Sequence, residues 1–375
     1  MRIVALDTQL IKVNHRGNWL HVILTDDEGH AGYGEASHGG FGPNRDEIVT
    51  AILMRQCWPV LEGAAPREVA RLTTRLRELA DGLAAATAVS ACEQALWDLA
   101  GQAAGVPVAT LFGGSTDREI PLYANINRAV KDRTPDGFAA SARAAVAGGF
   151  RAIKLAPFDG IDQRRIRERK QRSRVHGGIA CVATVRDAVG DDIDVMVDCH
   201  SAFDLGTAHQ VARELAALGV TWFEEPLPVR DLDAHRELKP VVNELGMELV
   251  GGELLFGIDG YWRYLAAGIW DVIMPDVKHC GGLAALRTIG QVAAEQGIGL
   301  APHNPSGPVA TIASGHALAA LPEHRPLEVA WGEVPWRSDV LDPPEAISAA
   351  ILRLADAPGL GISRLAAAAG HHPVQ

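Results

Sequence analysis

The chain has 375 residues, of which 47% are hydrophobic and 22% charged, and 46 acidic against 35 basic side chains give a net charge of −11. This composition excludes a disordered or fibrous protein, and the acidic balance argues against nucleic acid or an anionic membrane as a partner. No apolar run has the length of a membrane span, no leader-like N-terminus is visible, and the five cysteines are scattered without a CxxC pair. We therefore expect a soluble cytoplasmic protein with one large domain and a smaller one.

The first third of the chain predicts an α+β domain. Alternating apolar residues indicate strands at 1–13 and 19–25, and residues 26–29 carry the signal of a hairpin turn. Apolar residues at three- and four-residue steps indicate helices at 46–57, 66–80 and 84–104. Gly105 and Pro107 then stop the last helix. The domain is expected to cover residues 1–115.

After residue 115, short apolar strands alternate with Ala-rich helices. The eight expected strands lie at 120–126, 152–156, 193–200, 220–225, 247–253, 270–276, 298–303 and 326–329. Because almost every strand follows a helix, a closed parallel β/α barrel is favoured over an open sheet. The glycine-rich phosphate turn of an open nucleotide-binding sheet is also absent from the sequence. The tail is expected to be helical at 344–354 and 359–365.

Charged residues stand at the C-terminal ends of these strands, which face the mouth of a barrel. Read with the two-residue period of a strand, the inward positions are Lys154, Asp198, His200, Glu224, Glu253, Asp276, His303 and Glu328. From Asp198 to His303 the successive strand-end residues are about one strand–helix unit apart, so neighbours lie side by side. Charged side chains are seldom buried without a partner or a metal, and the ring therefore predicts an active site.

Three of these carboxylates, Asp198, Glu224 and Glu253, come from adjacent strands. They repel one another unless a cation lies between them, and an all-oxygen ligand set suits Mg²⁺ better than zinc. The alternative is three solvated strand-end acids.

Asp276 and His303 end neighbouring strands. A carboxylate that binds one imidazole nitrogen fixes the tautomer and leaves the other nitrogen as a base. The alternative for a single histidine is a satisfied core residue.

These residues make the chain resemble the enolase superfamily, in particular its mandelate racemase subgroup. The matching motifs are Gly32 to Ala36, the helix from Glu93 to Asp98, Lys154, Val197-Asp198, Glu224 to Pro226, Gly252-Glu253, Met274 to Asp276 with Gly281-Gly282, and His303. The resemblance spans essentially the whole chain. It implies a capping domain over a modified TIM barrel of (β/α)7β type at 116–342, with a C-terminal segment at 343–375 that packs back on the capping domain. It also implies homo-oligomers, an essential Mg²⁺, and removal of a proton α to a carboxylate to give a metal-stabilised enediolate.

Lys154 and Glu328 fit this chemistry as substrate-binding groups. An α-proton beside a carboxylate is too weakly acidic for imidazole unless the new negative charge is neutralised, which Mg²⁺ and the Lys154 cation achieve. A protonated Glu328 would hydrogen-bond the other carboxylate oxygen. A rim salt bridge is the alternative for Glu328, since Glu333 lies close in sequence.

Two departures from the racemase pattern favour a dehydratase. Racemases of this subgroup carry a second lysine where this chain has Ala156. His200, two residues after Asp198, resembles the histidine of galactonate- and mannonate-type dehydratases, which protonates the departing 3-hydroxyl. The alternative for His200 is a packing residue.

The remaining polar features are assigned as follows. Early loops with His15 and Trp19 are expected to close over the mouth and bind a hydroxylated ligand. Lys278 is interpreted as a rim residue. The basic segment 163–174 is read as a solvated helix face rather than a clamp for an anion.

The function expected is a Mg²⁺-dependent dehydratase that converts an aldonate or aldarate into a 2-keto-3-deoxy acid. The alternative enzyme is a racemase, epimerase or sugar-lactone cycloisomerase with Lys154 and His303 on opposite faces of the substrate. A non-catalytic ligand-binding barrel is the third reading.

Overall fold

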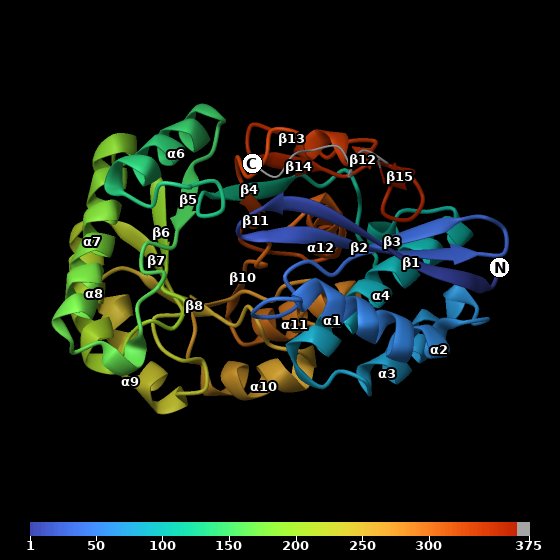
Figure 1. Ribbon diagram of the computed structural model, residues 1–375, viewed down its shortest axis with the longest axis horizontal. Coiled ribbons are helices and arrows are strands. Elements are labelled where there is room, and N and C mark those ends of the chain that lie inside the picture. The colour runs from blue at the N-terminus through green and yellow to red at the C-terminus, as the bar shows by residue number, and fades with distance from the viewer. Residues whose placement is uncertain (366–375) are drawn as a thin grey trace.

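The structure, a computed structural model, describes residues 1–365. Figure 1 shows an N-terminal unit, blue and on the right, beside a β/α unit that runs from green through yellow to brown. The last strands, in red, are at the top of the view, where β14 pairs with β4. Within the described part of the chain, no helix is both long and apolar enough to cross a membrane.

The N-terminal unit is an antiparallel sheet followed by helices. The sheet has the order β1 (Ile3–Asn14), β2 (Gly17–Asp26) and β3 (Ala31–Glu35). The helices are α1 (Arg45–Ile52), η1 (Leu53–Cys57), α2 (Trp58–Leu61), η2 (Pro66–Glu68), α3 (Val69–Arg77), α4 (Gly82–Ala104) and α5 (Val108–Leu111). The predicted turn joins β2 and β3, and within it Asp26 N donates to His30 O at 3.0 Å.

Helix α4 lies directly against β3, and this contact requires a glycine. A Cβ on Gly34 would lie 2.0 Å from the carbonyl oxygen of Ala91 in α4, a distance that no real side chain allows. The Gly32 to Ala36 motif thus lets the strand and helix backbones approach each other.

The second unit is a parallel barrel. Its strands and helices are β4 (Ile120–Asn125), α6 (Pro135–Ala147), β5 (Ala152–Leu155), η3 (Gln163–Arg165), α7 (Arg169–Val189), β6 (Asp194–Asp198), α8 (Leu205–Ala217), β7 (Val220–Glu224), α9 (Leu232–Glu244), β8 (Glu248–Gly251), α10 (Gly257–Ala267), β9 (Val272–Ile273), α11 (Leu283–Glu295), β10 (Gly299–Leu300), α12 (Pro308–Ala319) and β11 (Leu327–Ala330). Strands β4 to β10 pair in chain order, and β11 pairs with β4. Between β10 and β11 the wall closes through a hydrogen bond of 2.7 Å from Arg325 N to Leu300 O.

The unit is a barrel of eight strands with seven α-helices between them, and its strands have two buried faces. A separate buried cluster consists of Tyr123, Met196, Trp222, Val250, Val272, Met274 and Ala301, nearly all from different barrel strands. Residues on the other strand face join the larger core against the helices. No α-helix follows β11 within residues 1–365, so the expected modified TIM barrel is confirmed.

The chain is not helical at 344–354 and 359–365, where helices were expected, and this expectation was wrong. It forms η4 (Arg337–Asp339), β12 (Leu341–Asp342), β13 (Ala346–Ser348), β14 (Ile351–Arg353) and β15 (Arg364–Leu365). Strand β14 pairs antiparallel with the start of β4, and Leu352 is buried while Arg353 next to it is exposed. Alternation of this kind is a strand pattern, and Pro343 and Pro344 remove donors that a helix needs.

The tail also contacts α4 and α5, because Leu360 N donates to Asp98 Oδ1 and Val108 N to Gly359 O, both at 2.9 Å. Residues 366–375 of the expected C-terminal segment lie outside the described residues.

Two carboxylates of the N-terminal unit bind the N-termini of barrel helices. Glu93 accepts hydrogen bonds from Leu283 N (2.7 Å) and Ala284 N (3.0 Å) at the start of α11. Glu35 accepts them from Gly307 N (2.7 Å) and Ala310 N (2.9 Å) at the start of α12. Unpaired N–H groups at a helix start favour an anion, and these pairs therefore hold the two units together beside the barrel mouth.

Candidate active site

The three carboxylates predicted as metal ligands lie together at the ends of neighbouring strands. Asp198 ends β6 and is in register with Glu224 at the end of β7, and Glu253 follows β8. One oxygen from each lies within 4.8 Å of the others. The structure therefore holds an acidic cluster that could bind a metal ion.

The chemistry of the cluster fits a cation. Asp198 and Glu224 are almost completely buried, and Glu224 Oε2 is a buried oxygen with no hydrogen-bond partner in the described chain. Burial and the neighbouring carboxylates raise the pKa of Glu224, against the opposing effect of Lys154. Like charges at this spacing are costly, and carboxylate oxygens are the ligands of hard cations.

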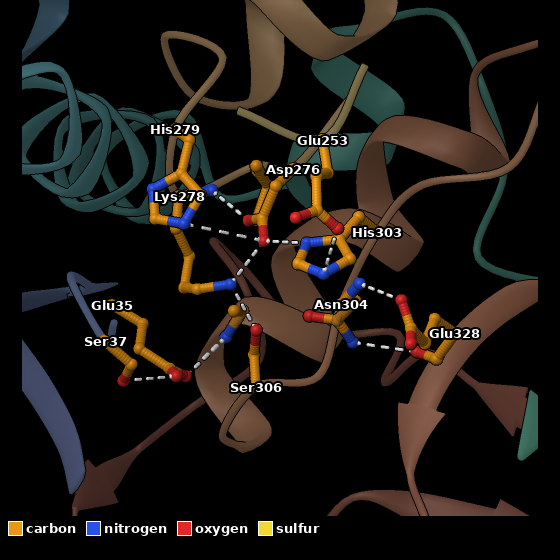
Figure 2. A network of polar contacts seen from close by, with 12 residues as sticks. Glu35, Ser37, Glu253, Asp276, Lys278, His279, His303, Asn304, Ser306 and Glu328 are labelled. Carbon is orange, nitrogen blue, oxygen red and sulfur yellow. Dashed lines mark hydrogen bonds and ion pairs between the residues drawn. The ribbon is translucent and has the colours of Figure 1, made fainter. Parts of the chain in front are cut away.

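Asp276 and His303 are in contact. His303 Nδ1 lies 2.8 Å from Asp276 Oδ2, and its Nε2 lies 3.0 Å from Glu253 Oε2 (Figure 2). Burial lowers the pKa of His303, but the carboxylates of Glu253, Glu328 and Asp276 outweigh it and raise the pKa to about 9. The ring is therefore fixed by Asp276 at one nitrogen, with the other aimed at the acidic cluster.

Lys278 is not a rim residue, and that expectation was wrong. Its side chain is fully buried, and Nζ donates to Asp276 Oδ2 at 2.6 Å and to the hydroxyl of Ser306. Figure 2 shows Asp276 between Lys278 and His303. Although burial raises the pKa of Asp276, Lys278, His279 and His303 together hold that pKa well below its ordinary value. The two-residue period places Lys278 on the inward face after Asp276, and this signal was available in the sequence.

Lys154 and Glu328 form a buried ion pair. Lys154 Nζ lies 2.9 Å from Glu224 Oε1 and 3.1 Å from Glu328 Oε1. Glu328 also accepts hydrogen bonds from Asn125 Nδ2 at 2.6 Å and Asn304 N at 2.9 Å. Burial raises the pKa of Glu328, but Lys154 and His303 outweigh it and lower the pKa. The protonated Glu328 expected as a donor is therefore not the form that these contacts favour.

His200 lies between two carboxylates. Its Nδ1 is 2.6 Å from Asp159 Oδ1, and its Nε2 is 2.8 Å from Asp198 Oδ2. Burial lowers the pKa of His200, but Asp198 and Asp159 raise it well above its ordinary value. The backbone of His200 is left-handed (φ 46°), a conformation that residues other than glycine adopt rarely and often at functional sites. Asp159, in the loop after β5, was missed because a loop residue has no strand period to mark it.

A cavity of about 610 Å³ opens over this site and is lined by Arg16, His38, Arg45, Arg128, Asp159, His200, Glu253, Lys278 and His303, among others. Neither His15 nor Trp19 lines it. His15 is exposed, whereas Trp19 is fully buried against Trp336. His15 and Arg16 form the turn between β1 and β2, and of these two only Arg16 lines the cavity.

The basic segment 163–174 does not line this cavity. Arg165 pairs with Glu168 at 2.8 Å, and the side chain of Arg167 is 93% exposed. These contacts agree with a solvated helix face.

The comparisons with known proteins cover both units. Residues 11–113 match the model of the mandelate racemase/muconate lactonizing enzyme N-terminal domain, and residues 137–367 match the enolase C-terminal domain-like model. The chain belongs to the mandelate racemase/muconate lactonizing enzyme family. Both family models therefore agree with the resemblance drawn from the motifs.

Individual members of the mandelate racemase/muconate lactonizing enzyme family align with nearly the whole chain. D-xylonate dehydratase of Haloferax volcanii is 29% identical over 95% of this chain and 86% of its own length. D-galactarolactone cycloisomerase of Agrobacterium fabrum is 28% identical over 90% of this chain and 86% of its own. A solved mandelate racemase/muconate lactonizing enzyme from Jannaschia sp. CCS1 superposes with a TM-score of 0.85 at 26% identity, covering 100% of this chain and 98% of that one.

Proposed function

We propose that this protein is a Mg²⁺-dependent dehydratase of a sugar acid, a lyase that forms a 2-keto-3-deoxy acid. The observation that carries the proposal is the position of His303 and His200 on one cavity, next to one acidic cluster. An elimination needs a base for the α-proton and an acid for the leaving hydroxyl, and two histidines on one cavity can supply the two roles. A cytoplasmic location and self-association remain predictions.

His303 is proposed as the base. Asp276 binds Nδ1, and Nε2 would accept the C2 proton of the substrate. Glu253 lies 3.0 Å from Nε2 and contributes most to the raised pKa of His303, and a cation bound to Glu253 would oppose that effect and favour the neutral ring. Lys278 holds the same Asp276 oxygen, so the carboxylate cannot rotate away from the ring.

The charge that develops on the substrate carboxylate needs cations. Asp198, Glu224 and Glu253 would hold Mg²⁺, which supplies positive charge beside that carboxylate when it is bound. Lys154, fixed between Glu224 and Glu328, is proposed to donate a hydrogen bond to the same substrate group.

His200 is proposed as the acid. Asp159 and Asp198 favour its protonated form, so it can deliver a proton to the departing C3 hydroxyl. Hydroxide is a poor leaving group unless it is protonated as it departs.

An epimerase or lactone cycloisomerase that uses Lys154 as a second base is less well supported. Two carboxylates enclose the Lys154 ammonium and hold its proton, and Ala156 stands where racemases have their second lysine. The similarity to a cycloisomerase keeps this reaction as the second candidate.

The test is proton NMR in D₂O with Mg²⁺, using aldonic acids, aldaric acids and their lactones. We expect one substrate to give a 2-keto-3-deoxy product, and both His303→Asn and His200→Asn to abolish that product. The matched control is His176→Asn, because His176 is exposed and outside the cavity. Deuterium that enters C2 without loss of water would refute the dehydratase and select the epimerase or cycloisomerase.

A further inference from the structure

One wall of the active-site cavity carries two arginines and a histidine that the proposed reaction does not use. Arg45 at the start of α1, His38 after β3 and Arg128 after β4 all line the cavity that contains His303. A cavity of about 610 Å³ is large enough for a whole sugar acid. The part of the substrate far from the reacting carbons would face this wall.

Arg128 has a buried donor without an acceptor. Its Nε donates to Glu333 Oε1 at 2.5 Å, whereas Nη2 is buried and finds no partner among the described residues. Its side chain is only 10% exposed. Buried donors are almost always satisfied, because an unpaired one has lost its hydrogen bonds to water without replacement. An acceptor oxygen of a ligand would complete the missing hydrogen bond of Arg128 Nη2.

Arg45 and His38 lie together above Gly17. A Cβ on Gly17 would lie 2.4 Å from His38 Cε1 and 2.6 Å from Arg45 Nη2, so the two side chains share this space. Arg45 donates to the carbonyl of Arg16 at 3.2 Å, and across residues 1–365 it has no carboxylate within 4.0 Å. Both ring nitrogens of His38 are buried without a hydrogen-bond partner. Burial, followed by the charge of Arg128, lowers the pKa of His38 well below its ordinary value, as expected in a positive environment.

The acids of the same cavity do not neutralise this wall. Asp159 already pairs with Arg16 at 2.8 Å and with Arg133 at 3.0 Å. Glu225 is held by the backbone, because its Oε1 accepts hydrogen bonds from Gly252 N at 2.9 Å and Glu253 N at 3.4 Å. Arg128 is paired with Glu333, so the unpaired positive charge of the wall is that of Arg45, and the unsatisfied donor is Nη2 of Arg128.

We propose that Arg45, Arg128 and His38 form a second carboxylate-binding subsite, and that the substrate is a sugar diacid, an aldarate. The proposal rests on the proposed function, because it requires that the other carboxylate be held near Lys154. Guanidinium groups bind carboxylates through paired, charge-assisted hydrogen bonds, and the free Nη2 of Arg128 is available for one. A monoacid presents a hydroxyl at this end and leaves the positive charge uncompensated.

The first experiment compares matched diacids and monoacids in the presence of Mg²⁺. Galactarate is compared with galactonate, and glucarate with gluconate, by the rate of 2-keto acid formation. We expect kcat/KM to be at least about tenfold higher for the diacid of one pair. Arg45→Gln is expected to lower kcat/KM for that diacid roughly 10- to 100-fold and to change the monoacid little.

The choice of variants keeps the test interpretable. Arg128→Gln leaves Glu333 buried without its partner, so Arg128→Lys is used as well because it retains the charge but not the forked donor. Arg167→Gln is the matched control on the exposed surface and should leave every substrate unchanged.

A binding experiment separates this proposal from the proposed function. Adipate is a dicarboxylate without hydroxyl groups and cannot be dehydrated, and hexanoate is its monocarboxylate counterpart. With Mg²⁺ present, adipate should raise the thermal midpoint more than hexanoate, and Arg45→Gln should remove the difference.

The outcomes point in different directions. Equal effects of adipate and hexanoate, together with equal turnover of diacids and monoacids, would overturn the subsite and leave the dehydratase standing. A response to adipate without turnover of any sugar acid would overturn the dehydratase and retain the subsite. Better turnover of 6-phosphogluconate than of glucarate would overturn the carboxylate in favour of a phosphate.

Discussion

Replacing Glu93 with glutamine is expected to change how the stability of the protein depends on pH. Glu93 accepts hydrogen bonds from Leu283 N and Ala284 N, and burial raises its pKa from 4.5 to about 7. Between these two values the folded protein binds the proton more tightly than the unfolded chain does. The free energy of unfolding therefore falls, through this group, as the pH rises from 4.5 to 7, and the group contributes no further change above that.

The size of the effect follows from the two pKa values. A shift of this extent corresponds to on the order of 3 kcal/mol, because one pKa unit is about 1.4 kcal/mol. Glutamine does not titrate, so the wild type should lose this much stability relative to Glu93→Gln between pH 4 and pH 8.

The assay is urea unfolding of both proteins at several pH values across that range. Glu78→Gln, at an exposed position of the same domain, serves as the control. A difference in unfolding free energy between wild type and Glu93→Gln that stays constant with pH would refute the reasoning, since all other titrating groups are common to both proteins.

Three further changes have defined outcomes. Gly282→Ala should lower the free energy of unfolding in urea by roughly 1–3 kcal/mol, because φ is 92° and a Cβ would lie 1.9 Å from Glu93 Oε2; unchanged stability would contradict this. Lys278→Met should cost roughly 3 kcal/mol in the same assay, because it leaves Asp276 buried without its lysine, and wild-type stability would mean that the pair is dispensable. MgCl₂ at about a hundred times its dissociation constant should stabilise the wild type by about 2.7 kcal/mol in a thermal scan. The same addition should leave Asp198→Asn unaffected. An equal response of both proteins would mean that the ion binds elsewhere.

The barrel and its strand-end residues could be predicted because strand geometry links sequence to space in a simple way. Side chains alternate along a strand, and parallel strands of a barrel end on one side, so Asp198 and Glu224 fall in register at the mouth. The same rule places Lys278, two residues after Asp276, on the inward face, but it was not applied when Lys278 was interpreted as a rim residue. The helical prediction for the tail failed for a related reason, because Leu352 is a strand residue that pairs with the start of β4.

Residues from loops could not be predicted in this way, and they include the groups most closely tied to the choice of substrate. Asp159 meets His200 across 41 positions of sequence, and Arg128 enters the cavity from the loop after β4. No local period fixes where such side chains point, because the packing of the capping domain on the barrel decides it. That packing depends on Glu35 and Glu93, which bind the N-termini of helices α12 and α11. The family motifs in the first third of the chain thus hold the N-terminal unit against the barrel, next to the cavity that we propose as the active site.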